Sequence, residues 1–170
     1  MSDAEVASFL AEERTVTCAT GGPRGWPHLM PLWYVLREPS SDAPHGSAAS
    51  IQVIAPPGPR IWAWTYGSSQ KVRNIERDPR ATLQVEAGER YQDLRGVMLE
   101  CDVIVHRDTE KIAALGKEIF ARYASPRGEP AVTELAVDTM VAAQAQKRVA
   151  LEFVELRRAT WDHRKLGGAY

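Results

Sequence analysis

The sequence predicts one mainly β domain, an antiparallel barrel with helices packed on its flank. Runs of β-branched, aromatic and alternating apolar residues recur along the chain, which is typical of short strands. Their order is strands, one short helix, more strands, two helices and a last strand, which favours a barrel. No internal repeat or composition shift divides the 170 residues, so we expect a single domain over residues 1–170.

The first half of the chain opens with a predicted helix and a hairpin. Val6, Phe9 and Leu10 lie on one side of a helix expected over residues 4–13. Glycines and a proline at 21–25 predict a turn that joins the first two strands. Six strands are expected in all, at residues 14–20, 28–36, 61–65, 81–87, 97–106 and 148–158.

The strand at 28–36 is apolar on both faces, so we expect both faces to be covered. Pro31 within it predicts a bulge or a sheet edge, where backbone groups stay free. Residues 38–58 are rich in Pro, Ser, Ala and Gly and are expected to form a long functional or mobile loop, with a short strand at 51–54 as an option.

The second half contains two predicted helices before the last strand. Asp108 is placed to cap a helix in which Ile112, Leu115, Ile119 and Tyr123 recur at helical spacing. Residues 125–130 are expected to break it, and a second helix is expected over about 132–146.

The composition argues against several classes of function. A formal net charge of −1 gives no field that favours nucleic acid or an anionic membrane. No apolar run approaches the roughly 20 residues that span a bilayer, and the acidic N-terminus lacks the pattern of a secretory signal. Cys18 and Cys101 stand alone in strand-like runs, as expected for core residues in a reducing cytoplasm. Four scattered histidines predict no metal site.

Residues 66–80 carry the clearest sign of a binding site. A strand ends there in glycine and two serines, and a serine hydroxyl is expected to cap the short helix that follows by accepting a backbone N–H of its first turn. Val72 and Ile75 form an apolar side of this helix, and Pro79 ends it. Lys71 lies in the first turn, where a cation opposes the helix dipole. An anion such as a phosphate would offset that cost, because free N–H groups, hydroxyls and an ammonium would converge on it.

Two interpretations of this segment remain open from the residues alone. It is either a phosphate site or an ordinary capped surface helix with a lysine in an unfavourable place. Within the first interpretation, Lys71 shares a face with Asn74, whereas Arg73 points away and aligns with Arg77. The nearby Trp62 and Trp64 face one side of their strand, either to bind a flat conjugated ligand or to fill the core or a dimer interface.

Residues 67–83, GSSQKVRNIERDPRATL, resemble the signature of the flavin and deazaflavin split-barrel oxidoreductases, the pyridoxamine 5'-phosphate oxidase-like superfamily. The opening helix, the turn at 25–28, the alternating strands and the ending WDHRKLGG at 161–168 also resemble this family, so the likeness extends over most of the chain. The resemblance implies a six-stranded antiparallel Greek-key barrel of the FMN-binding split-barrel type. It also implies a homodimer with cofactor sites at the subunit interface, each holding FMN or the deazaflavin F420.

The resemblance also implies positions for the cofactor. Residues that match the family's phosphate-holding segment are Thr65, Ser68, Ser69 and Lys71, with Trp64 and Arg73 as neighbouring candidates. Met30, Pro31 and Leu32 match the strand whose backbone lies along the tricyclic ring. The tail residues Trp161 and Arg164 are candidates for reaching the partner's site.

The sequence departs from its relatives at one informative position. Many relatives have an arginine two residues before the lysine, where this chain has Ser69. The segment also lacks the arginine pattern for the substrate phosphate of true pyridoxamine phosphate oxidases, so that reaction is not expected.

The function expected from this resemblance is hydride transfer between F420 and a small, hydrophobic, conjugated substrate, with no protein catalytic residue required. The alternatives are an FMN enzyme on the same fold and a non-catalytic flavin- or haem-binding protein. The expected partners are a second copy of the chain and a small-molecule substrate, with no nucleic acid and no membrane.

Overall fold

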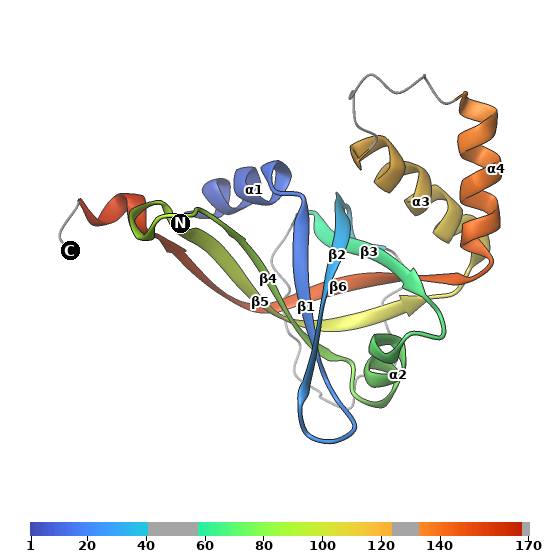
Figure 1. The fold of residues 1–170 in the computed structure, drawn as a ribbon, viewed down its shortest axis with the longest axis horizontal. Coiled ribbons are helices and arrows are strands. Elements are labelled where there is room, and N and C mark those ends of the chain that lie inside the picture. The colour runs from blue at the N-terminus through green and yellow to red at the C-terminus, as the bar shows by residue number, and fades with distance from the viewer. Residues whose placement is uncertain (41–57, 124–132, 168–170) are drawn as a thin grey trace.

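Six antiparallel strands close into a barrel in the computed structural model of this chain (Figure 1), which describes residues 1–40, 58–123 and 133–167. The order around the barrel is β1-β2-β3-β6-β5-β4, with β4 returning to β1. The strands are β1 (Thr15–Gly21), β2 (Pro27–Arg37), β3 (Arg60–Tyr66), β4 (Arg80–Ala87), β5 (Arg95–His106) and β6 (Arg148–Asp162). The predicted barrel is confirmed, and each of the six expected strands is present.

The last strand of the chain lies between two earlier strands of the barrel. β6 pairs with β3 on one side and with β5 on the other, so a segment at the C-terminal end of the chain holds two earlier strands together. Its first residue, Arg148, is the register partner of Tyr66, the last residue of β3. Paired residues in an antiparallel ladder point to the same face of the sheet. The register therefore brings Arg148 beside the turn that leads into the predicted phosphate segment.

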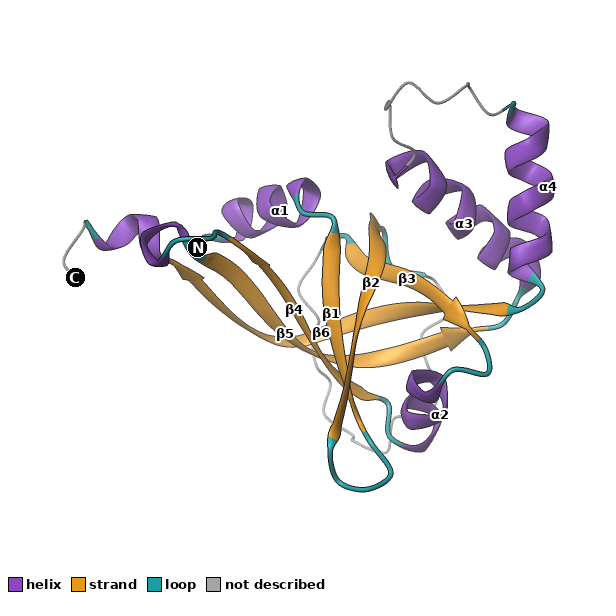
Figure 2. Ribbon diagram, in the orientation of Figure 1, coloured by secondary structure: helices purple, strands orange, loops and turns teal. Residues whose placement is uncertain are grey.

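The helices lie outside the barrel (Figure 2). They are α1 (Asp3–Glu12), α2 (Gln70–Arg77), α3 (Thr109–Tyr123) and α4 (Glu134–Ala145), with short 3₁₀ turns at Tyr91–Asp93 and His163–Leu166. A capping box between Ser2 and Glu5 starts α1. The Asp108 carboxylate accepts the backbone N–H of Lys111, which confirms the predicted cap of α3. None of the helices in the described ranges is long and apolar enough to cross a membrane.

Apolar side chains gather in two clusters. The larger one fills the barrel and includes Val16, Leu83 and Leu151, all fully buried. The smaller one lies between the outer face of β3 and α3, and Trp62, Leu115 and Ile119 belong to it. The second cluster fixes α3 against the barrel wall, beside the site described below.

The strand β2 has a neighbour on both sides along only part of its length. Residues 27–33 pair with β1, but pairing with β3 begins only at Tyr34. Pro31 therefore lies on a free edge, and not at a bulge, which settles the two options left open by the sequence. Leu29, Met30 and Trp33 on this edge are 55%, 43% and 55% exposed. Within one chain, the expected coverage of both faces is not found there.

Three expectations concern residues outside the described ranges. They are the conformation of most of the loop at 38–58, the optional strand at 51–54 and the helix break at 125–130.

Candidate functional site

A cavity of about 540 Å³ opens between the barrel and the α3–α4 pair. One wall comes from β2 and the end of β3, and the opposite wall comes from the two helices. Its lining residues are Pro31, Leu32, Trp33, Trp64, Thr65, Lys71, Gly116, Ile119, Phe120, Met140, Val141, Gln144 and Arg148. The size suits a cofactor or a drug-sized molecule.

Lys71 lies at the polar end of this cavity and is only 6% exposed. Its ammonium donates to the Thr65 hydroxyl at 3.0 Å, and no carboxylate in the described part of the chain pairs with it. Burial lowers the pKa of Lys71, and the nearby Arg148 lowers it further, although Cys18 acts in the opposite direction. A lysine on the surface of a short helix would be exposed. The interpretation of residues 66–80 as an ordinary capped surface helix is therefore wrong. Lys71 shares its buried side of α2 with Asn74, as predicted.

The serine at the start of α2 does not cap the helix. Ser69 occupies the N-cap position, but its hydroxyl makes no hydrogen bond to the helix backbone. The hydroxyl oxygen is buried and has no partner among the described atoms. The sequence predicted a capping hydroxyl, and that expectation is wrong. A buried hydroxyl without a hydrogen-bond partner costs stability. The unpartnered Ser69 hydroxyl is therefore one feature expected of a ligand site.

A second cation lines the cavity from the other side. The Arg148 guanidinium lies 4.5 Å from the centre of the Trp64 ring and 4.4 Å from that of Tyr66. Its Nε donates to the side-chain oxygen of Gln144 on α4 at 3.3 Å. No local sequence pattern points to this residue, because only the β3–β6 register brings it here.

The two tryptophans of β3 have different environments. Trp64 is partly buried and lines the cavity. Trp62 is 4% exposed, packs in the second apolar cluster and stacks on His106 with 4.8 Å between ring centroids. The ligand interpretation therefore fits Trp64, and the core interpretation fits Trp62. A side chain at Gly116 would meet the Trp64 ring at 2.5 Å, so α3 reaches its place only because this position is glycine.

The structure brings together some of the remaining predicted residues and not others. Pro31 and Leu32 line the cavity, and Met30 lies next to them on the exposed edge of β2. Ser68 is exposed in the turn before α2. Arg73 is exposed on the outer side of α2 and does not line the cavity.

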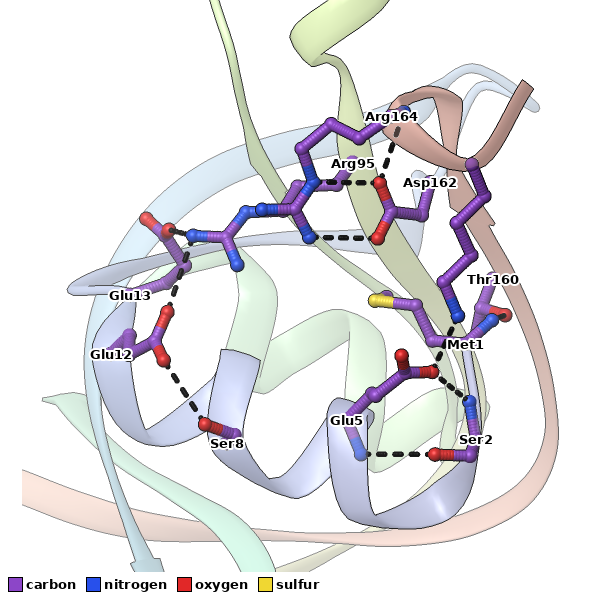
Figure 3. Close-up of polar contacts among 11 residues, drawn as sticks. Met1, Ser2, Glu5, Ser8, Glu12, Glu13, Arg95, Thr160, Asp162 and Arg164 are labelled. Carbon is purple, nitrogen blue, oxygen red and sulfur yellow. Dashed lines mark hydrogen bonds and ion pairs between the residues drawn. The ribbon is translucent and has the colours of Figure 1, made fainter. Parts of the chain in front are cut away.

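The tail residues lie at the other end of the molecule (Figure 1). Trp161 packs over Gly96, where an added Cβ would lie 2.2 Å from its ring. Arg164 is held by Asp162 through two hydrogen bonds of 2.8 and 2.7 Å (Figure 3). These residues and Lys71 do not meet within one chain, and their contact with a partner's site stays a prediction.

Sequence reasoning missed a buried polar network on the barrel wall. The Glu152 carboxylate is fully buried and accepts from Arg60 at 2.6 Å, from Ser40 at 2.6 Å and pairs with His106 at 2.9 Å. Burial alone would raise the pKa of Glu152, but these three partners bring it down to about 2. The network is fixed by register, since Glu152 lies opposite Trp62.

Outside this network, the histidines and cysteines of the described ranges form no further centre. His163 packs on Tyr91, and its Nδ1 lies 2.8 Å from the Tyr91 carbonyl oxygen. Cys18 and Cys101 are buried and unbonded, which confirms their predicted role as core residues. Within the described ranges no group of three His, Cys, Asp or Glu residues is arranged to hold a metal ion.

The closed six-stranded barrel, with a short helix after β3 whose first turn carries Lys71, defines the split-barrel class of proteins. The sequence matches the family described as pyridoxamine 5'-phosphate oxidase over residues 2–153, and the chain belongs to that family. The resemblance noted from residues 67–83 is thereby confirmed. No curated protein is a significant match to this sequence.

Several solved structures share the fold. The conserved hypothetical protein Rv2991 from Mycobacterium tuberculosis has 35% sequence identity and a TM-score of 0.75, with 100% of this chain and 90% of that chain covered. A protein described as an F420 reductase has 19% identity and a TM-score of 0.57 over 89% and 94% of the two chains. The haem storage protein HutZ from Vibrio cholerae has 13% identity and a TM-score of 0.60 over 94% and 93%. The last two likenesses concern the fold alone.

Proposed function

We propose that this protein is an oxidoreductase that binds F420 in the cavity between β2, β3 and the α3–α4 pair. The observation that carries the proposal is Lys71, a buried ammonium at the cavity with a hydroxyl partner and no carboxylate among the described residues. A buried charge without a counter-charge is costly, and an anionic ligand would offset that cost. FMN is the alternative cofactor, because it also carries an anionic phosphate that could offset the charge of Lys71.

The residues present fit such a cofactor at both ends. Lys71 and the unpartnered hydroxyl of Ser69 are suited to a phosphate near the N-terminus of α2, where the helix dipole also favours an anion. The first turn of α2 contains no acidic residue that would repel it. Along the free edge of β2, the backbone of Met30, Pro31 and Leu32 is available to a flat ring, and Trp64 closes the cavity beside Lys71.

In this proposal the cofactor supplies the hydride chemistry, and the protein binds, orients and excludes water. Ile119, Phe120, Met140 and Val141 give the helical wall an apolar surface. That surface favours a small, hydrophobic, conjugated substrate. None of the residues lining the cavity is an acid or a histidine, so we expect proton transfer from a side chain to contribute little.

We also propose that the active form is a homodimer located in the cytoplasm. The exposed Leu29, Met30 and Trp33 form an apolar strip along the edge of β2, and Trp33 lines the cavity as well. A second copy packed on this strip would bury it and complete the cavity wall. Sedimentation velocity with saturating cofactor tests the dimer, and a monomer at micromolar concentration would contradict it.

The experiment that tests the cofactor is a fluorescence-quenching titration of the purified protein with F420, FMN and haem. We expect F420 to bind with the lowest Kd, and reduced F420 to be oxidised when an acceptor is added. Tight binding of FMN alone would show that FMN, and not F420, is the cofactor. Binding of haem alone, or of none of the three, would overturn it.

A further inference from the structure

We infer that Arg148 is a second anion-binding residue of this cavity, so that the bound ligand carries negative charge toward Arg148 as well as toward Lys71. The identity of the ligand rests on the proposed function, but the anion site does not. No part of the sequence signature includes Arg148, which lies more than 60 residues beyond it on another strand.

The structure holds the Arg148 side chain in place from three directions. The register pairs its backbone with Tyr66, and the Gly67 N–H donates to the Lys147 carbonyl at 2.9 Å, which ties the α4–β6 turn to the β3–α2 turn. The guanidinium carbon lies over the rings of Trp64 and Tyr66, and Gln144 accepts from Nε. Such restraint removes much of the conformational entropy that an arginine would lose on binding.

The restraint leaves the donating end of the guanidinium available. Only Nε has a hydrogen-bond partner among the described residues, and none of the ion pairs found there involves Arg148. The two terminal nitrogens form a fork that matches phosphate or carboxylate oxygens. A purely structural stack on two aromatic rings would not require the residue to line a cavity.

The positive charge of Arg148 makes the buried positive charge of Lys71 less favourable. Arg148 is among the groups that lower the pKa of Lys71, so the two positive charges lie close enough to disfavour each other. Among the described residues that line the cavity, none has an acidic side chain. The pair fits a ligand with a dianionic phosphate, or with a phosphodiester followed by carboxylates, and it provides the arginine that the signature lacks at Ser69.

The test compares Arg148→Gln with Arg157→Gln, an exposed arginine of the same strand whose partner is Glu100 on the barrel surface. Each protein is titrated with FMN and riboflavin, and with F420 and its phosphate-free deazaflavin core. We expect Arg148→Gln to weaken binding of the phosphorylated ligands about 10-fold or more and to change the phosphate-free ligands less than about 3-fold. The Arg157→Gln variant should bind all four like the wild type. Equal losses for charged and uncharged ligands would show a structural role and overturn the inference.

A second measurement keeps this result separate from the proposed function. Inorganic pyrophosphate should raise the Tm of the wild type saturably, and the rise should be lost in Arg148→Gln and kept in Arg157→Gln. If no flavin or deazaflavin binds the wild type, the proposed function fails while this measurement still tests the anion site. A pyrophosphate shift that is absent in the wild type, or that is unchanged in Arg148→Gln, would overturn the Arg148 assignment.

Discussion

The two ends of this barrel contain the same kinds of cation in opposite electrostatic settings. At the end where α1 meets the C-terminal segment, basic side chains have carboxylate partners: Arg95 with Glu12, Arg164 with Asp162, and Lys165 with Glu5 (Figure 3). In the cavity at the other end, Lys71 and Arg148 have hydroxyl, amide and aromatic neighbours instead. The first set is therefore neutralised within the chain, whereas the second set has the unpaired charge that the proposed anionic ligand would neutralise.

The largest effect is expected from removing Glu152, the fully buried carboxylate partner of Arg60. Glu152→Ala leaves Arg60 without its buried counter-charge and His106 without its hydrogen-bond partner, so we expect a loss of about 3–5 kcal/mol in the free energy of unfolding. Urea denaturation at pH 7 measures it. A loss below about 1 kcal/mol would show that the pair is not stabilising.

The same substitution has a pH dependence with a definite sign. The pKa of Glu152 is about 2 in the folded protein against an ordinary value of 4.5, so its contribution is fully present above 4.5. It is lost as the pH falls from 4.5 through 2. The stability difference between wild type and Glu152→Ala should therefore shrink in that window. A difference that is constant down to pH 2 would contradict the assignment.

The next effect concerns the cavity cation itself. Lys71→Ala should weaken binding of the phosphorylated cofactor by roughly 1.5–3 kcal/mol, the usual scale of a charge-assisted hydrogen bond. Arg157→Gln on the barrel surface is the matched control and should leave affinity unchanged. The measurement is the same quenching titration, and an unaltered Kd in Lys71→Ala would remove Lys71 from the site.

Lys71 also allows a stability test in the absence of ligand. Because burial lowers its pKa below the ordinary 10.5, the unfolded chain binds more protons between the two values, and stability should rise with pH in that window. Lys71→Met should remove this rise and should raise the Tm of the ligand-free protein near pH 7. A lower Tm for Lys71→Met would show that the ammonium stabilises the empty cavity.

Alanine substitutions at two glycines, one at each end of the barrel, are expected to have smaller effects on stability. A Cβ at Gly116 would meet Trp64, and one at Gly96 would meet Trp161, so alanine at either position should cost about 1–3 kcal/mol through overpacking. Within one chain only Trp64 lines the cavity, so Gly116→Ala should also weaken ligand binding. Thermal unfolding and titration of both variants separate the two effects. A loss of affinity in Gly96→Ala as well would support the predicted contact of Trp161 with a partner's site, whereas an unchanged affinity in Gly116→Ala would contradict the location of the site.

The smallest expected effect comes from the exposed pair at the tail. Lys165→Ala removes an ion pair with Glu5 in which both side chains are about half exposed, so the Tm should change by no more than about 2 °C. A larger drop would mean that the paired end depends on individual surface charges more than such pairs usually contribute.

The sequence predicts local features of this protein well and long-range juxtapositions poorly. Alternation identified the strands, because each has one face in a single core, and the turn with Lys71 was visible because its residues are adjacent. Burial of Lys71 and the orphaned hydroxyl of Ser69 were missed, since both depend on what packs against α2. Arg148 and Glu152 were missed because only the register of β6 on β3 gives them their neighbours.

The position of β6 between β3 and β5 has a consequence for how the protein is made. During synthesis the first five strands emerge from the ribosome before β6, which pairs with both β3 and β5. Until β6 is made, β3 and β5 each have one unpaired edge. Closure then requires contacts between residues far apart in the chain, which slow folding. Arg148 is the first residue of that joining strand, so a nascent chain acquires its complete anion site only when the barrel closes.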